Sequence, residues 1–108
     1  MARSDAASPL DDSSVPFYTI GQVADLLGVQ PAALRRIEEQ GLIRPDRSGG
    51  GQRRYSRDEV DRLREVLALT DEGVTLAGVR HVLELRRRVS DLEDELAQAR
   101  EQADSADG

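Results

Sequence analysis

Apolar residues recur at helical spacing in two short groups between positions 19 and 40. Residues 19–22 fit a capping box, which predicts the start of a first helix, and Gly28 is suited to end it. Pro31 favours the first turn of a second helix over residues 31–40, which Gly41 stops. The positions expected to face inward are Ile20, Val23, Ala24 and Leu27, followed by Leu34 and Ile37. Two short amphipathic helices joined by a tight turn predict a helix-turn-helix.

The segment after Gly41 has the pattern of a hairpin followed by a helix. Residues 42–43 predict a short strand, residues 45–51 a flexible glycine-rich turn, and residues 52–55 a returning strand, which together form a β-hairpin wing. A second capping box at residues 56–59 starts another helix, which ends near residues 71–73. Its expected inward positions are Val60, Leu63, Val66 and Leu67.

Beyond Thr75, which can cap a further helix, apolar residues alternate by three and four positions. The seam comprises Val82, Leu85, Val89, Leu92, Leu96 and Ala99. This spacing over roughly three heptads predicts a coiled coil. Pairing with a second copy would bury the seam and gain roughly 25 cal/mol per Å² of apolar surface. The alternative is that the seam folds back on its own N-terminal domain. The residues predicted to mediate dimerisation are Val82, Leu85, Val89, Leu92 and Leu96.

Together these elements predict a mainly α fold: a winged helix-turn-helix head with a small β-hairpin wing, followed by a C-terminal coiled-coil dimerisation helix. We expect residues 1–16 to form a disordered N-terminal arm, because they are rich in Ser, Asp, Ala and Pro. Residues 17–80 would form the head and residues 81–101 the coiled coil. Residues 102–108 would form a disordered acidic tail.

The charge is distributed unevenly, which changes the meaning of the formal net charge of −6. Residues 35–64 carry nine arginines against six acidic residues, whereas residues 89–108 carry one arginine against seven. The middle of the chain is therefore suited to binding the phosphates of DNA, and most of the acidity belongs to the C-terminal segment. Acidic side chains within residues 91–95 would keep that segment away from a duplex.

The composition argues against several other classes of function. The chain has no cysteine and a single histidine, His81, so we expect neither a metal site nor a cofactor. The three glycines at residues 49–51 lack the Lys-Ser/Thr pair and the helix of a phosphate-binding loop. No apolar run is long enough to span a bilayer, and residues 1–14 lack the apolar stretch of a signal peptide. We expect a non-enzymatic cytoplasmic protein that associates with the nucleoid.

Four motifs in order resemble the DNA-binding head of MerR-family transcription regulators. They are TIGQVA at residues 19–24, the LRR helix at 34–36, Gly-Leu-Ile at 41–43 and the RRYS end of the wing at 53–56. The segment EGVTLAGVRHVLEL is most similar to the heat-shock repressor (HspR-like) branch of that family. The resemblance covers about residues 17–98.

This resemblance implies that the second predicted helix enters the major groove of DNA. Arg35 would read guanine edges or bind a phosphate, and Arg36 lies beside it. The start of the same helix favours a phosphate through its backbone dipoles. In the wing, Arg53 and Tyr55 match positions that hold the DNA backbone. The implied DNA-binding residues are Gln30, Pro31, Arg35, Arg36, Arg47, Arg53, Arg54 and Tyr55.

Other roles for these residues remain open. Arg35 could instead pair with a neighbouring glutamate on a solvated helix face, and Tyr55 could pack under the third helix. We expect Arg57, Arg62 and Arg64 to be ordinary solvated charges, and the arginines at residues 86–88 to be solvated flanks of the coiled coil.

The resemblance further implies a homodimer joined by an antiparallel coiled coil, which binds an inverted-repeat operator in successive major grooves of double-stranded DNA. Many relatives carry an effector domain after the coiled coil. We expect none here, and therefore a repressor without a small-molecule sensor of its own. A chaperone is the co-repressor in the heat-shock branch, so a protein co-regulator such as a chaperone is a candidate partner. The alternatives are a DNA-bending architectural or excisionase-like factor and a protein-interaction adaptor.

Overall fold

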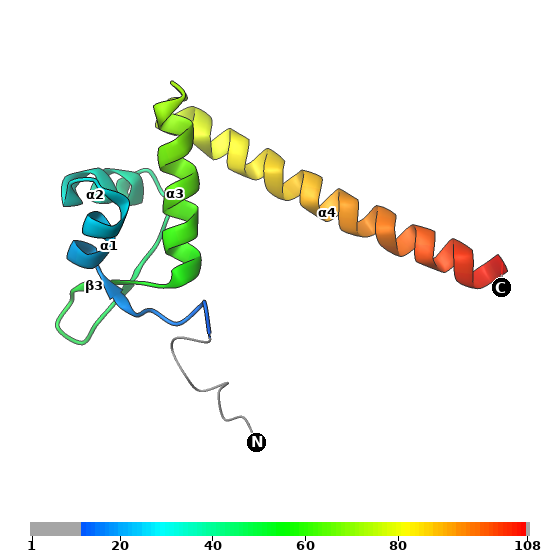
Figure 1. The fold of residues 1–108 in the computed structure, drawn as a ribbon, viewed down its shortest axis with the longest axis horizontal. Helices are drawn as coiled ribbons and strands as arrows, with labels where there is room; N and C mark the ends of the chain where they lie inside the picture. Colours follow the sequence, from blue (N-terminus) through cyan, green and yellow to red (C-terminus); the bar gives the residue numbers. More distant parts are fainter. Residues whose placement is uncertain (1–11, 108) are drawn as a thin grey trace, which may run out of the picture. The chain divides into compact units, whose positions relative to one another are not determined.

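The computed structural model describes residues 12–107, which divide into two compact units between Leu76 and Ala77. The N-terminal unit contains strand β1 (Tyr18–Thr19), helices α1 (Ile20–Leu27) and α2 (Pro31–Glu39), strands β2 (Asp46–Arg47) and β3 (Arg53–Tyr55), and helix α3 (Arg57–Asp71). Helix α4 (Leu76–Asp107), apart from its first residue, makes up the described part of the C-terminal unit (Figure 1). The predicted mainly α fold, a helix-turn-helix head with a small wing followed by a long helix, is confirmed.

The first three helices begin and end where the sequence predicts, within a residue or two. Thr19 starts α1 and Ser56 starts α3, each through a complete capping box. Gly28 and Gly41 follow α1 and α2 in the left-handed region, with φ of 71° and 75°. At the end of α2 the N–H of Leu42 donates to the carbonyl of Ile37 at 3.3 Å, a Schellman motif.

The sheet differs from the predicted two-stranded hairpin. It has three antiparallel strands in the order β1-β3-β2, so β3 lies in the middle. The predicted strand at residues 42–43 is wrong, because the backbone there completes the Schellman motif of α2 and both side chains are buried in the core. The first wing strand is instead β2, four residues later. Strand β1 was not predicted, since only two residues pair before α1 begins.

The core of the N-terminal unit is aliphatic except for Tyr55. Helix α3 supplies four of its residues, at positions separated by three. The described core side chains are Val23, Ala24, Leu34, Ile37, Leu42, Ile43, Tyr55, Val60, Leu63, Val66 and Leu69. Leu67 was expected to face inward but is only half-buried, whereas Leu69 completes the inner face of α3. This core fixes α2 and the wing relative to each other.

The segment before β1 is more ordered than predicted. Within it, Ser14 donates through its N–H and its hydroxyl to Asp12 Oδ1, at 2.9 and 2.7 Å, and these hydrogen bonds lower the pKa of Asp12. The carbonyl of Ser13 accepts from the N–H of Asp58 at 3.0 Å, which satisfies a donor in the first turn of α3. Residues 12–16 thus belong to the folded unit, and the remainder of the predicted disordered arm, residues 1–11, lies outside the described residues.

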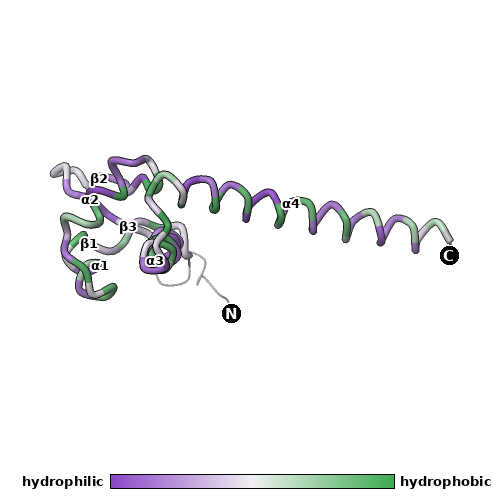
Figure 2. The backbone as a smooth tube through the Cα atoms, turned by 90° about the horizontal axis from the view of Figure 1, so that it is seen from above, coloured by the Kyte–Doolittle hydropathy of each residue, from purple (hydrophilic) through white to green (hydrophobic). Residues whose placement is uncertain are grey.

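Helix α4 is longer than the predicted coiled coil. It continues to Asp107, so residues 102–107, which were expected to be disordered, are helical. Residues 97–103 are Ala, Gln, Arg and Glu, all good helix formers, so nothing in the sequence ends the helix at residue 101. Bands of hydrophobic and hydrophilic residues alternate along it (Figure 2). None of the helices in residues 12–107 has the length and apolar content needed to cross a membrane.

Candidate nucleic-acid interface

A single carboxylate on α2 contacts both strands of the wing. Glu38 accepts a hydrogen bond from Arg53 Nε on β3 at 2.5 Å, and Arg47 Nη2 on β2 lies 3.4 Å from its second oxygen. The two arginines are direct partners in the antiparallel register of β2 and β3. Arg47 also donates to the carbonyl of Gly51 at 3.1 Å, across the turn of the wing. These contacts fix the wing against the last turn of α2.

A hollow of about 410 Å³ lies between α2, the start of α1 and the wing. Three arginines from different elements converge on it: Arg35 from α2, Arg47 from β2 and Arg53 from β3. Its complete lining is Thr19, Ile20, Arg35, Arg47, Gly51, Gln52 and Arg53. We call this hollow the basic groove. It brings together residues that the sequence placed in two separate motifs.

The arginines of the basic groove retain donors for a ligand. The hydrogen bond to Glu38 raises the pKa of Arg53, which secures its positive charge. This bond uses Nε alone, and no other residue in the described part of the chain accepts from its Nη groups. Arg35 is exposed and forms no ion pair with any residue from 12 to 107, so the alternative pairing with a neighbouring glutamate is not found. Planar guanidinium groups with spare donors are suited to phosphate oxygens.

The neighbouring arginines on α2 face different surroundings. Arg36 lies away from the basic groove and lines a smaller hollow of about 140 Å³ with Ile37 and residues of α3. Adjacent helical residues point about 100° apart, which explains the separation.

At the start of α2, Gln30 is exposed and makes no side-chain cap, while its carbonyl accepts from the N–H of Ala33 at 2.9 Å. Pro31 is half-buried beside it.

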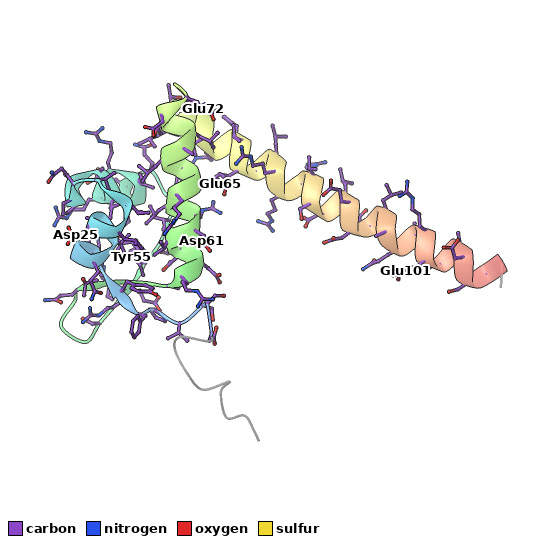
Figure 3. The ribbon with its side chains drawn as sticks, viewed as in Figure 1. Asp25, Tyr55, Asp61, Glu65, Glu72 and Glu101 are labelled. Atoms are coloured by element: carbon purple, nitrogen blue, oxygen red, sulfur yellow. The ribbon has the colours of Figure 1, made fainter. Side chains whose placement is uncertain are left out.

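Tyr55 is the main correction to the predicted interface. Its side chain is 0% exposed and lies inside the N-terminal unit (Figure 3), so in this structure it has no access to DNA. Burial raises the pKa of its hydroxyl, and the charge of Glu38 raises it further. That hydroxyl is buried without a hydrogen-bond partner among the described residues. The packing role that the sequence left open for Tyr55 is the one observed.

Arg54 occupies the face of the sheet opposite to Arg53 and Tyr55. Side chains alternate along a strand, and Arg54 pairs with Thr19 of β1 on one side and Asp46 of β2 on the other. It is half-buried and does not line the basic groove. A contact between Arg54 and DNA would therefore need a different approach from that of Arg53.

The predicted seam of α4 is a stripe of exposed apolar side chains. Leu85, Val89, Leu92 and Leu96 are 62%, 53%, 56% and 50% exposed, while Val82 at the start of the stripe is half-buried. An apolar hollow of about 300 Å³ lies along it between Val82 and Val89. No other residue of α4 covers these four side chains. We call them, with Val82, the apolar stripe.

Comparison with known proteins assigns this head to a family. Residues 18–85 match the family described as MerR HTH family regulatory protein. The chain belongs to the MerR family. Its members are transcription regulators and not enzymes. The match begins at β1 and ends within α4, so it includes α2, the wing and the basic groove.

Individual relatives agree with this MerR assignment. The heat shock protein HspR of Streptomyces coelicolor is 42% identical over 94 residues, which cover 86% of this chain and 60% of that protein. The HTH-type transcriptional regulator GlnR of Bacillus anthracis is 38% identical over 73 residues, covering 68% of this chain and 57% of that protein. The chain therefore spans less than two thirds of the length of these relatives.

Solved structures show the same MerR fold. HiNmlR, a MerR family regulator lacking the sensor domain and bound to promoter DNA, superposes with a TM-score of 0.60 over 79% of this chain and 71% of that one. A MerR family regulator from Bacillus cereus gives a TM-score of 0.58 over 79% and 69%. Both are 22% identical to this chain, so they establish the shared fold alone.

Sequence reasoning missed two side chains that organise this MerR head. The sequence indicates Glu38 and Glu39 only as alternative partners of Arg35 on a solvated helix face, yet Glu38 contacts the wing. Arg62 was expected to be a solvated charge, but its Nε donates to the carbonyl of Leu42 at 2.7 Å. Contacts between residues 15 or 20 positions apart leave no local pattern, and only the fold could have revealed them.

Proposed function

We propose that this MerR-family chain is a transcription repressor that binds double-stranded DNA as a homodimer. The observation that carries the proposal is the basic groove, in which arginines from α2 and from both strands of the wing converge. A helix and a wing that approach the same duplex can contact the major groove and the adjacent backbone together. In this proposal α2 enters the major groove, Arg35 reads base edges, and Arg47 and Arg53 bind phosphates.

The other residues predicted to contact DNA lie outside the basic groove, so their proposed roles are less direct. Gln30 and Pro31 begin α2, where the dipole of a nine-residue helix favours a phosphate. Arg36 and Arg54 do not line the basic groove, so we assign them supporting contacts with the flanking backbone. Tyr55 contributes by packing beneath β3 and has no contact with DNA. The affinity should depend mainly on the three arginines that line the groove.

We propose a second copy of this chain as the partner of the apolar stripe. Four exposed apolar side chains spaced by three and four positions match the seam of a two-stranded coiled coil. In an antiparallel pair that places Val89 against Leu92 of the second copy, Arg88 would lie opposite Glu95 of that copy. The arginines at residues 86–88 would then face acidic residues 93–95 of the second copy.

Such a dimer presents two heads related by a two-fold axis, which predicts an inverted-repeat operator. The likeness to the heat shock protein HspR supports a role in a stress response. It also makes a chaperone a candidate co-regulator. We place the dimer on the cytoplasmic nucleoid, where it would repress by covering promoters.

A salt titration tests DNA binding. A duplex is selected by the wild-type protein from a random-sequence library, and its affinity is measured by fluorescence anisotropy at several salt concentrations. If four to six phosphates per dimer are contacted, the slope of log affinity against log salt should be roughly −4 to −5. Arg35→Ala should weaken binding strongly. Arg64→Ala, at an exposed position of α3, should not.

The selected sequences distinguish the candidate functions. Enrichment of inverted repeats supports a dimeric regulator, and a promoter–reporter fusion carrying such a repeat then measures the direction of regulation. Enrichment of one asymmetric, strongly bent site would favour an excisionase-like factor. A flat salt dependence with no enriched duplex would reject DNA binding and favour a protein-interaction adaptor.

A further inference from the structure

The side chain that holds the wing against α2, Glu38, is negatively charged, which is unexpected beside a groove proposed to bind DNA. Glu38 contacts two of the arginines that line the basic groove, and a negative charge at that place should weaken the attraction of a polyanion such as DNA. Its side chain is only 21% exposed, and both of its oxygens are engaged by arginines that line the groove. The charge of this carboxylate therefore weakens the attraction of DNA. A role of Glu38 in DNA binding has to come from the contacts that it makes.

The geometry of Arg53 indicates that Glu38 orients its guanidinium group. Its Nε is held by Glu38, which leaves the edge of the guanidinium that carries the Nη groups for an acceptor in the groove. A long arginine side chain otherwise samples many rotamers, and fixing it on binding costs conformational entropy. Because β2 and β3 place Arg47 directly opposite Arg53, the same carboxylate restrains both strands of a wing that contains only five strand residues.

We propose that Glu38 is a positioning residue for DNA binding: it presents Arg53, and with it Arg47, to backbone phosphates in a fixed orientation. The proposal rests on the proposed function of the basic groove. A positioning role and a purely electrostatic role predict opposite changes in DNA affinity when the charge of Glu38 is removed. If Glu38 acted only as a charge, its removal would strengthen binding to every duplex. If it positions Arg53, its removal should weaken binding and reduce the number of phosphates contacted.

The experiment compares Glu38→Gln with Glu39→Gln. Glu39 is exposed on the same turn of α2 and forms no ion pair within residues 12–107, so the second variant removes the same charge without the contact. Both variants are titrated with the duplex selected by the wild-type protein and with a random-sequence duplex, across a range of salt concentrations. Circular dichroism melting curves establish that each variant is folded.

For Glu38→Gln we expect affinity for the selected duplex to fall roughly tenfold, as for the loss of one charge-assisted hydrogen bond. The salt slope should become shallower by about 0.9 for each head that loses a phosphate contact. Partial unfolding alone would lower the active fraction and leave the slope of the folded protein unchanged. Glu39→Gln should keep the wild-type slope, with affinity equal to or above that of the wild type.

Glu38→Asp provides a second variant, because it keeps the charge and withdraws the carboxylate by one methylene. It should lose affinity as Glu38→Gln does, and the NMR signal of the Arg53 Nε–H should shift in both variants but not in Glu39→Gln. Wild-type slope and affinity in both Glu38 variants would overturn the proposal, as would tighter binding by Glu38→Gln. A wild-type protein that binds no duplex would instead reject the proposed function itself.

Discussion

Arg62 of α3 donates through Nε to the backbone carbonyl of Leu42 at 2.7 Å, and so joins the third helix to the segment that follows α2. The bond is partly buried, and its donor is charged. Arg62→Met keeps most of the aliphatic length but leaves this carbonyl without its donor. We expect the free energy of unfolding to fall by about 1–2 kcal/mol, measured by urea denaturation.

Arg64→Met is the matched control, because Arg64 is exposed on the same helix and has no hydrogen bond or ion pair to the described residues. Its effect should stay within about 0.5 kcal/mol. Equal stability of the two variants would show that the bond to Leu42 contributes nothing.

Tyr55→Phe tests the buried hydroxyl and the pH dependence of stability. Burial raises the pKa of Tyr55 in the folded protein, so the unfolded chain releases this proton at a lower pH. The stability linked to this group is therefore fully present below pH about 10, the ordinary tyrosine value, and is lost as the pH rises toward the folded pKa. The variant should lose less stability than the wild type across this alkaline range.

Near neutral pH the same variant should be as stable as the wild type or slightly more stable. The hydroxyl has no hydrogen-bond partner among the described residues, so its removal relieves a desolvation cost. Denaturation curves at a series of pH values check both statements. Parallel alkaline profiles, or a loss above about 2 kcal/mol at pH 7, would indicate that the hydroxyl has a stabilising partner.

Gly28→Ala tests the left-handed residue between α1 and α2. Open space surrounds a Cβ at this position, but φ is +71°, which disfavours any residue with a side chain. The N–H of Val29 also depends on this turn for its bond to Ala24 at 3.0 Å. We expect a loss of about 1–2 kcal/mol in thermal denaturation. Gly49→Ala, where a Cβ also meets open space and φ is not positive, should be nearly neutral.

Charge reversal on α4 tests the orientation of the proposed dimer. Arg88→Glu alone and Glu95→Arg alone should each weaken self-association, because two attractive pairs become repulsive; the expected cost is about 1–2 kcal/mol at low salt. In the antiparallel register a mixture of the two variants restores both pairs in the heterodimer. Analytical ultracentrifugation of the mixture should therefore recover wild-type affinity. Parallel pairing would leave repulsive contacts in that mixture and no full recovery.

Much of the head could be predicted from the sequence because its signals are local. A capping box, a left-handed glycine and a proline each act within one turn of backbone, and they locate α1, α2 and α3 closely. The strand at residues 42–43 was mispredicted for the same reason. Two adjacent apolar residues suit a strand or a buried helix end equally, and the hydrogen bond from Leu42 to Ile37 decides between them.

The site was predicted less completely, because its geometry depends on contacts between distant residues. The separation of Arg35 from Arg36 follows from helical periodicity, which the sequence contains. The burial of Tyr55 depends on how β3 packs in the core, and the engagement of Arg53 depends on Glu38, which is 15 residues away. Conversely, the spacing of the apolar stripe on α4 can be read from the sequence alone, and its role in dimerisation stays a prediction.

The bond between Ser13 and Asp58 bears on where this domain begins. The family match starts at residue 18, yet the carbonyl of Ser13 supplies an acceptor to the first turn of α3, and the N–H of Phe17 extends the ladder beside β3 by bonding to Tyr55 at 3.0 Å. A fragment trimmed to the family boundary would lose both interactions at once. Recombinant heads, and natural fusions that join another module at this point, should therefore retain the five or so residues that precede Phe17 if they are to keep the full stability of the unit.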